Sequence, residues 1–351
     1  MKHYHSPLGS WTIICLLLLV IVLPASALEK VGTTSMQVLK IPVGVRGIGM
    51  GSAMVSETGG ADAVWWNPGA MIHLKKNQIT LSQINMPAEV HLNAISYVRA
   101  LNEYDAVTLH AINLFTGDMP VRTVDRPEGT GENFNASDFI LGAGYCHRMT
   151  DRFSLGGNLR YLHSALYDYS FDGFSFDLGT LYRTGLRSLK LGMAIQNLGQ
   201  DVKYDGQFLD YREAGRNDED PQNESFEGAA LPTVFRLGIS FDMFEMFNWN
   251  QEGVENPHGA DIAVEMDHPN DNQERLNLGG EYNYKETLFL RLGGKFGYDE
   301  ESFAGGFGLK FQVMGDYWFT FDYAYSHMGR ITEAVDDFAG QPHRFGLGFI
   351  W

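Results

Sequence analysis

Glycine-rich stretches are the first places where residue type and spacing in this sequence could do chemistry. Residues 44–53 read Gly-Val-Arg-Gly-Ile-Gly-Met-Gly-Ser-Ala, and such runs can bind phosphate through exposed backbone N–H groups. The run fits neither the dinucleotide-binding spacing nor the P-loop, because it lacks the final Gly-Lys-Ser/Thr. Gly47, Gly49 and Gly51 are better explained as positions where a compact segment turns tightly and packs closely.

Catalytic and metal-binding signatures are missing from the sequence. It contains neither the Gly-x-Ser-x-Gly nucleophile elbow nor a His-Glu-x-x-His zinc helix, and its histidines have no regular ligand spacing. Residues 267–272 resemble a calcium loop in composition but lack the glycine and final glutamate of an EF-hand. We therefore expect no catalytic residues, no metal and no cofactor. A hydrolase site assembled only in the fold stays open as an alternative.

The last fifty residues indicate that the structural elements of this protein are β-strands, so any functional site would be positioned by strands. One face of the final strand contains His343, Phe345, Leu347, Phe349 and Trp351, and the other contains mostly small or polar residues. Side chains alternate between the two faces of a strand, so one face is largely aromatic and apolar. A chain that ends on an aromatic strand residue is typical of a barrel whose last strand pairs with its first, which leaves no open edge in lipid.

The same alternation predicts fourteen strands. They lie near residues 77–85, 88–100, 104–114, 137–148, 152–163, 171–183, 187–197, 232–243, 259–267, 274–284, 286–297, 302–312, 316–327 and 342–351. The long connections, 115–136, 198–231 and 328–341, all fall at one end, whereas the other end has mostly tight turns, with 244–258 as the exception. Short periplasmic turns and long external loops are typical of outer-membrane proteins. The predicted fold class is all-β, a transmembrane antiparallel β-barrel of about 14 strands.

Charged residues in these strands fall on the face opposite the apolar one. A charge that faces lipid at mid-bilayer costs about 2–4 kcal/mol, so we expect the charged row to line the lumen. Its members have both signs, which permits ion pairing across the lumen: Arg160, Asp177, Arg183, Lys190, Arg236, Asp242, Asp261, Glu265, Arg275, Glu281, Arg291, Lys295, Lys310, Asp322 and Arg344. A structural role is favoured over ion selectivity.

The N-terminus predicts secretion. Lys2 precedes an apolar run of residues 12–23, and Ala25-Ser26-Ala27 forms a small-x-small cleavage site, so residues 1–27 read as a signal peptide. The run is shorter than the roughly 20 residues that a spanning helix needs. Cys146 is the only cysteine outside this segment, which excludes an intramolecular disulfide in the processed chain. We expect a bacterial outer-membrane location.

The amino-acid composition limits the classes of partner that this protein could bind. The formal net charge of −17 argues against nucleic acid and against a basic patch that holds anionic lipid. Forty glycines and 13% aromatic residues suit curved strands with aromatic girdles. The acidic connection 205–227 reads as a solvated loop, and a docking surface or a Ca²⁺-dependent surface is an alternative. Expected partners are outer-membrane lipid and the barrel-assembly machinery.

Several short motifs carry a family resemblance by their order along the chain. They are residues 44–53, Asp62-Ala63, Trp65 with the turn Trp66-Asn67-Pro68-Gly69, residues 196–199 (Gln-Asn-Leu-Gly), residues 231–238 and the closing run 341–349. Together they resemble the PorV/PorQ family of outer-membrane proteins, relatives of the FadL long-chain fatty-acid transporter. The resemblance covers nearly the whole chain after residue 27.

The resemblance implies a fourteen-stranded barrel (residues 77–351) with an N-terminal plug, or hatch (residues 28–76), inside it. The family's Asn-Pro-Ala hatch motif corresponds to Asn67, Pro68 and Gly69, so this chain departs at the third position and the motif's gating role does not carry over. PorV-like members serve type IX secretion by receiving the C-terminal signal of exported cargo at the cell surface, whereas FadL-like members bind a hydrophobic ligand and pass it laterally through the barrel wall. Secreted cargo bound at external loops is the leading expectation, and a hydrophobic ligand such as a fatty acid is the alternative.

Overall fold

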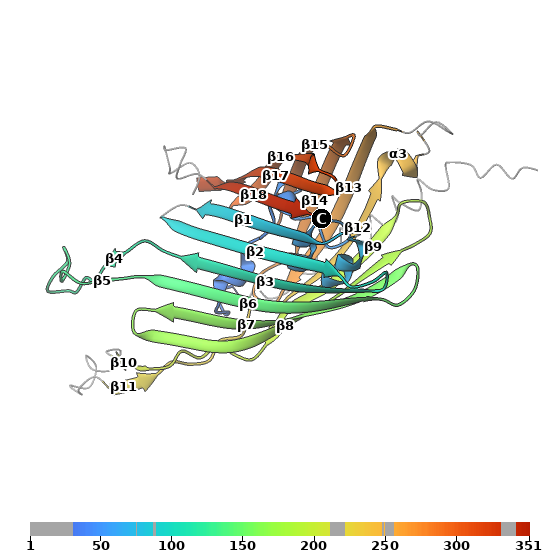
Figure 1. The fold of residues 1–351 in the computed structure, drawn as a ribbon. Helices are drawn as coiled ribbons and strands as arrows, with labels where there is room; N and C mark the ends of the chain where they lie inside the picture. Colours follow the sequence, from blue (N-terminus) through green and yellow to red (C-terminus); the bar gives the residue numbers. More distant parts are fainter. Residues whose placement is uncertain are drawn as a thin grey trace, which may run out of the picture.

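A closed barrel of fourteen antiparallel strands forms the body of the protein (Figure 1). The computed structural model describes residues 31–74, 76–86, 89–210, 222–247, 249, 256–330 and 342–351, so the predicted signal peptide lies outside it. Each barrel strand pairs with the barrel strands that precede and follow it in the sequence, and all of these pairs are antiparallel. The last strand pairs with the first from Gln78↔Ile350 to Ile84↔Arg344, which confirms the predicted closure.

All fourteen predicted strands are present. Their bounds are β1 (Gln78–Met86), β2 (Val90–Ala100), β3 (Asp105–Phe115), β6 (Ala136–Arg148), β7 (Phe153–Leu166), β8 (Tyr169–Arg183), β9 (Lys190–Gly199), β12 (Val234–Asp242), β13 (His258–Pro269), β14 (Arg275–Tyr284), β15 (Leu288–Phe296), β16 (Glu301–Met314), β17 (Tyr317–Met328) and β18 (His343–Ile350). Two short hairpins outside the barrel are additional to the prediction, β4 (Met119–Pro120) with β5 (Asn133–Phe134) and β10 (Gln207–Asp210) with β11 (Gln222–Ser225).

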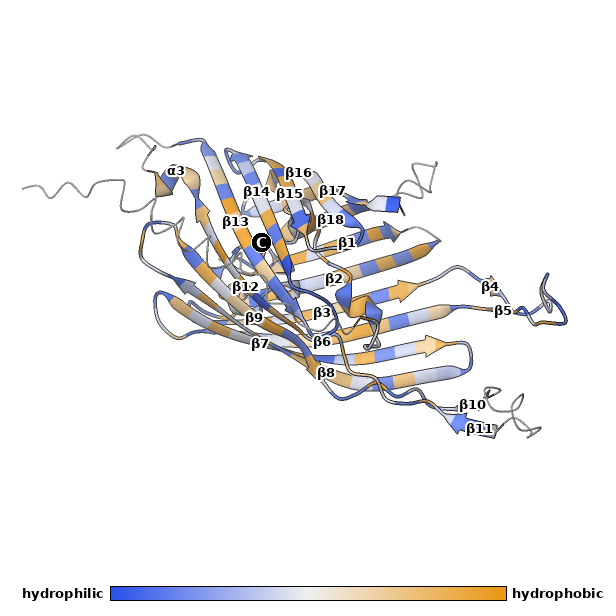
Figure 2. Cartoon of the chain, turned by 180° about the vertical axis from the view of Figure 1, so that it is seen from behind, coloured by the Kyte–Doolittle hydropathy of each residue, from blue (hydrophilic) through white to orange (hydrophobic). Residues whose placement is uncertain are grey.

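Alternating side chains give the wall two different surfaces. Outward positions carry large apolar side chains such as Leu109, Leu159 and Leu292, which are exposed on the outer face. Figure 2 shows the bands of hydrophobic and hydrophilic residues that result along the strands. An apolar outer face and fully paired backbone are what a bilayer requires of a spanning sheet.

The connections at the two ends of the barrel differ in length. Residues 116–135, 200–233 and 329–342 join strands at one end, which we call the loop end, and both extra hairpins lie there (Figure 1). Residues 101–104, 149–152, 285–287 and 315–316 join strands at the opposite, turn end. The exception foreseen from sequence, residues 243–257, also lies at the turn end and begins with α3 (Met243–Met246).

The segment before β1 contains four short helical turns and lies inside the barrel, drawn in blue in Figure 1. These turns are η1 (Gln37–Lys40), α2 (Val45–Gly49), η2 (Ala61–Trp65) and η3 (Pro68–His73). Their apolar side chains form one buried core with inward residues of the strands, among them Leu92, Ile112 and Ile140. In the described part of the chain, no helix is long and apolar enough to cross a membrane.

Candidate functional site

The segment of residues 31–74, which we call the hatch, packs against most of the inner wall. Its α2 contacts β15 to β18, and its η3 contacts β3 and β6 to β8 on the other side of the lumen. Because α2 and η3 contact opposite halves of the barrel wall, the hatch lies across the lumen between the loop end and the turn end.

Asn67 makes three hydrogen bonds, one to the wall and two within the hatch. Its Nδ2 donates to the carbonyl oxygens of Val55, at 2.6 Å, and Thr180 on β8, at 2.9 Å. Its Oδ1 accepts from the backbone N–H of Gly69 at 2.8 Å and so caps η3, with Pro68 at the first helical position. The side chain is completely buried, so all of these bonds lie in a water-poor environment.

Gly69 explains why the third position of the hatch motif differs from alanine in this chain. A Cβ atom at residue 69 would lie 2.6 Å from the carbonyl oxygen of Gly179 on β8. Contacts below 3.0 Å force a shift, and the atoms that this Cβ would meet, in Gly179 and Thr180, all belong to the backbone of β8. The glycine therefore allows the hatch to approach the wall more closely than an alanine would.

The other predicted hatch residues lie against several different strands of the inner wall or pack within the hatch. Gly51 has φ +62°, and a Cβ there would lie 2.9 Å from the carbonyl oxygen of Leu278, so glycine is favoured for conformation and for space. Gly47 lies against the indole ring of Trp66, and Gly49 lies beside Arg291. Asp62 accepts a hydrogen bond from Ser96, and Trp65 packs edge-on against His110.

Further hydrogen bonds join the hatch backbone to wall side chains. Glu265 on β13 accepts from the N–H groups of Met54 and Val55, both at 2.6 Å. Carbonyl oxygens of the hatch accept from further wall residues, among them Ser154 to Gly69, Asn158 to Val64, Gln196 to Trp65 and Ser240 to Ser56. The wall thus supplies partners for backbone groups that the short helical turns leave unpaired.

A buried group of charges, which we call the Arg46 network, connects the hatch to three regions of wall. The guanidinium of Arg46 on α2 donates to both carboxylate oxygens of Glu281, at 3.0 and 2.8 Å, and lies 3.3 Å from Glu57. Glu57 in turn pairs with Lys190 at 3.2 Å. On the far side, Arg291 bridges Glu281 and Asp322.

All fifteen charged residues of the predicted inward row occupy the inner register of their strands. Several meet as ion pairs, including Arg160 with Asp177 and Arg236 with Glu265. The sequence did not indicate that hatch residues Arg46 and Glu57 would pair with Glu281 and Lys190 of this row. The available signal was that Arg46 and Glu57 are the two charged residues within the otherwise uncharged, glycine-rich stretch 41–60.

The closing strand places its predicted face outward. Phe345, Leu347 and Phe349 are exposed on the outer surface, and Trp351 follows the strand and stacks on Tyr97. His343 shares this face but is only 4% exposed, because Tyr323 and Tyr325 pack against it. The histidines that lie at strand ends are dispersed, and no group of three or more metal-ligating side chains in the described ranges could hold a metal ion.

Two cavities lie on either side of the hatch. The loop-end vestibule, of about 330 Å³, lies between hatch residues such as Ile41 and Trp66 and wall residues such as Arg236, Arg275 and Arg344. Tyr298 also lines it, and burial raises the pKa of this phenol well above its usual range. The turn-end vestibule, of about 640 Å³, lies beyond the Arg46 network and is lined by Asp62, His73 and Trp318 among others.

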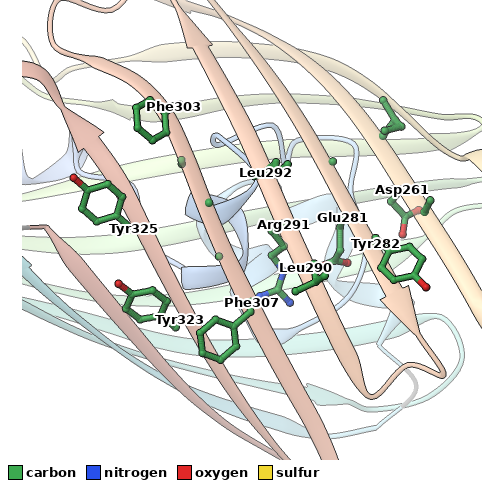
Figure 3. Close-up of a pocket in the computed structure, with 16 residues that line it drawn as sticks. Asp261, Glu281, Tyr282, Leu290, Arg291, Leu292, Phe303, Phe307, Tyr323 and Tyr325 are labelled. Carbon is green, nitrogen blue, oxygen red and sulfur yellow. Dashed lines mark hydrogen bonds and ion pairs between the residues drawn. The ribbon is translucent and has the colours of Figure 1, made fainter.

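A third cavity, of about 860 Å³, is a groove on the outer face across β13 to β17. Figure 3 shows Phe303, Phe307, Tyr323 and Tyr325 along one side of it and Tyr282 with Leu290 along the other. The groove is deep at Gly280 and Gly305, because glycine has no side chain that could project outward there. Glu281 and Arg291, also drawn, belong to the Arg46 network on the inner side of the same wall.

Part of the predicted acidic loop falls outside the described residues. Of the connection 205–227, residues 211–221 are not described, and these include six of its charged side chains. The prediction that this loop docks a partner or binds Ca²⁺ therefore stays untested by the geometry. Residues 202–205 and 229–230 form isolated bridges that hold the base of the loop to β8 and to the hatch.

An apolar outer face, a closed sheet and a lumen occupied by an N-terminal segment define a fourteen-stranded outer-membrane β-barrel with an internal hatch. Solved structures agree on the fold. A Pseudomonas aeruginosa FadL homologue matches 92% of this chain and 98% of its own, at 12% identity and a TM-score of 0.52. The Pseudomonas putida toluene transporter TodX matches 88% of this chain and 97% of its own, at 12% identity and a TM-score of 0.56. The Ralstonia pickettii toluene transporter TbuX matches 88% of this chain and 96% of its own, at 12% identity and a TM-score of 0.52.

The sequence itself matches one protein family. Residues 25–256 match the family described as "Type IX secretion system protein PorV", which is more than half of the chain. The chain therefore belongs to the PorV family, as its motifs predicted. No curated protein sequence matches it significantly.

Proposed function

We propose that this protein takes part in type IX protein secretion by engaging exported proteins at the loop end of the barrel. Membership of the PorV family supports a secretion role. The observation that carries the mode of action is the occupied lumen. Hydrogen bonds and ion pairs fix the hatch to the wall at Asn67, Glu265 and Arg46, and these contacts oppose passage of a polypeptide through the lumen. Recognition of cargo is thus favoured over conduction.

Processing and assembly follow from the same proposal. We expect signal peptidase to remove residues 1–27, after which the barrel-assembly machinery inserts the strands into the outer membrane. Lipid contacts the outward apolar face. We propose no enzymatic activity and no cofactor, because the sequence contains no catalytic or metal-binding signature.

The test deletes one loop-end hairpin and follows secretion. Residues 207–225, which include β10 and β11, are replaced by a short Gly-Ser linker in the native host. We expect exported proteins to accumulate in the periplasm while the barrel reaches the outer membrane in normal amounts. Replacement of residues 118–134, which include β4 and β5, is the matched control at the same end. Normal secretion in both deletion strains and in a strain without the protein would refute the proposal.

Transport of a hydrophobic small molecule is the second candidate. It is favoured by the fold shared with the toluene transporters and by Trp66 and Ile41 in the loop-end vestibule. Under this hypothesis the purified barrel retains an acyl or aromatic ligand that mass spectrometry of extracted lipids detects. Trp66→Ala should lower the retained amount, whereas Trp249→Ala, in the exposed connection 243–257, should not. Trp65 packs against His110 and is not among the residues that line the vestibule, so its substitution should have a smaller effect than that of Trp66.

A further inference from the structure

The groove on the outer face of β13 to β17 follows one row of outward residues. Cross-strand pairing aligns these residues in the order Ile262, Gly280, Leu292, Gly305 and Tyr325. The two glycines lie on either side of Leu292, so the surface is low on both of its flanks. A Cβ atom at Gly280 or Gly305 would meet no atom nearer than 3.6 Å, so each glycine leaves open space on the outer face.

Aromatic side chains form walls beside this row. The neighbouring row toward the turn end contains Tyr282, Leu290, Phe307 and Tyr323, which Figure 3 shows around the groove. Histidines hold two of these rings in place. The hydroxyl of Tyr282 lies 2.6 Å from Nδ1 of His258, and the hydroxyl of Tyr323 lies 2.8 Å from Nδ1 of His343. Rings that are already held lose less conformational freedom when a ligand packs between them.

The position of the groove favours a lipid over a protein as its occupant. The groove lies in the apolar outer face of the wall, and each of its strands is paired on both sides, so it offers no free backbone edge to a polypeptide. In lipid, van der Waals packing rather than the hydrophobic effect holds apolar groups together. An acyl chain in a groove contacts side chains on three sides, whereas a chain on a flat wall contacts them on one.

The length of the groove is comparable with one leaflet of a membrane. Its five strands are separated by four spacings of about 4.8 Å, so its ends are roughly 19 Å apart. One leaflet contributes about half of a hydrocarbon core that is ~30 Å thick. The groove begins near the turn end of β13, at Ala260, and finishes near the loop end of β17, at Tyr325. It therefore extends into the membrane from the turn-end surface.

A cation lies at the turn-end side of the groove. Lys285 is exposed in the turn after β14, and its Nζ lies 5.4 Å from the centre of the Tyr284 ring. That ring also packs against His258, which bonds Tyr282 of the groove wall. Among the described residues Lys285 forms no ion pair, and the neighbouring Glu286 pairs with a different lysine. An ammonium group at this place suits the phosphate of a lipid whose chain lies in the groove.

We propose that the groove binds one glycerophospholipid of the periplasmic leaflet, with an acyl chain over Gly280 and Gly305 and the phosphate at Lys285. Short turns mark the periplasmic end of an outer-membrane barrel, so Lys285 lies at that leaflet. At the loop end, the connection between β15 and β16 carries Asp299 and Glu300, and like charges oppose the phosphates of lipid A. This site is separate from the proposed secretion role, because it lies on the lipid-facing side of the wall.

The test measures lipid binding to the whole barrel by native mass spectrometry. The protein is purified from the outer membrane, stripped of lipid by detergent exchange and incubated with palmitoyl-oleoyl phosphatidylethanolamine or, separately, with lipid A. We expect one phospholipid per barrel. Gly280→Leu and Gly305→Leu should each lower the bound fraction about fivefold or more, because the added side chain replaces contacts of the acyl chain. Lys285→Gln should lower it about fivefold through the loss of one basic contact.

Matched variants separate the groove from the rest of the wall. Gly157→Leu adds the same side chain at an outward glycine of β7, outside the groove, and should leave the bound fraction unchanged. Arg99→Gln removes an exposed cation at the turn end of β2 and is the control for Lys285→Gln. Gly280→Leu and Gly305→Leu fill different parts of the groove, so either one tests the site if the other fails to insert as a barrel.

Three results would overturn the site: no phospholipid bound by the parent barrel, equal binding by the parent and both groove variants, or an equal loss in Gly157→Leu. Tighter binding of lipid A than of phospholipid, or unchanged binding in Lys285→Gln, would overturn the assignment to the periplasmic leaflet. A protein that co-purifies with the parent and is lost in Gly305→Leu, without any change in bound lipid, would show that the groove binds a protein instead.

Discussion

Arg46 of the hatch and Glu281 of β14 are joined by two hydrogen bonds, from Nε at 3.0 Å and from Nη2 at 2.8 Å. The two residues are 235 positions apart in the sequence, and both side chains are mostly buried. The pair connects a segment that ends before the first strand to the middle of the barrel wall. Three predictions test how this connection and its neighbours hold the hatch, and a fourth tests the outward face of the wall.

Arg46→Gln should destabilise the barrel by about 3 kcal/mol, because removal of one partner leaves a buried carboxylate without its main counter-charge. Urea unfolding in phospholipid vesicles, followed by tryptophan fluorescence, measures this change. Lys76→Gln removes an exposed ion pair with Asp316 and is the control, with an expected loss of about 0–1 kcal/mol. Equal losses in the two variants would show that the Arg46 network does not stabilise the fold.

Asn67→Ala should also cost about 3 kcal/mol in the same assay. The substitution removes the η3 cap and leaves two buried carbonyl groups, those of Val55 and Thr180, with one partner fewer. Asn102→Ala, which removes an exposed capping side chain in the 101–104 turn, should cost less than half as much. A smaller loss at residue 67 than at residue 102 would contradict this reading of the hatch.

Gly69→Ala should destabilise the protein by about 1–3 kcal/mol, since the added methyl group would lie 2.6 Å from the Gly179 carbonyl oxygen. The matched variant is Gly280→Ala, where a Cβ would meet only the Ile262 side chain at 3.6 Å. We expect that variant to remain within about 0.5 kcal/mol of the parent protein. The melting temperatures of the two purified variants, each compared with that of the parent protein, measure this difference in stability. Tolerance of alanine at residue 69 would mean that hatch and wall are not in tight contact.

Leu292→Arg should reduce membrane insertion, because this side chain is 75% exposed on the outward face of β15. An arginine that faces lipid near mid-bilayer costs about 2–4 kcal/mol. The control is Val124→Arg, in the loop-end connection 116–135, where the side chain is already surrounded by solvent. The fraction of folded barrel recovered from vesicles measures both variants. Full insertion of Leu292→Arg would place that face of β15 outside the bilayer.

The sequence alone determined the strands and their order. Alternation in β7, where Leu155 and Leu159 face outward and Ser154 and Asn158 face inward, is a local property that the chain shows without any partner. Short turns then force sequential strands to pair, so fourteen strands and the closure by β18 followed. The family motifs also identified the PorV family from sequence, because the order of motifs along a chain can be read without knowledge of the fold.

Only the tertiary structure decided what the hatch and the lumen contain. Arg46 pairs with Glu281, Asn67 bonds Thr180, and Arg344 points into a vestibule shared with Trp66. Each of these contacts joins residues that are more than a hundred positions apart, and the alternation pattern specifies the face of a side chain but not its partner. Which charges are paired and which are left uncompensated depends on how the hatch fits the closed barrel, and this fit exists only after all fourteen strands have enclosed it.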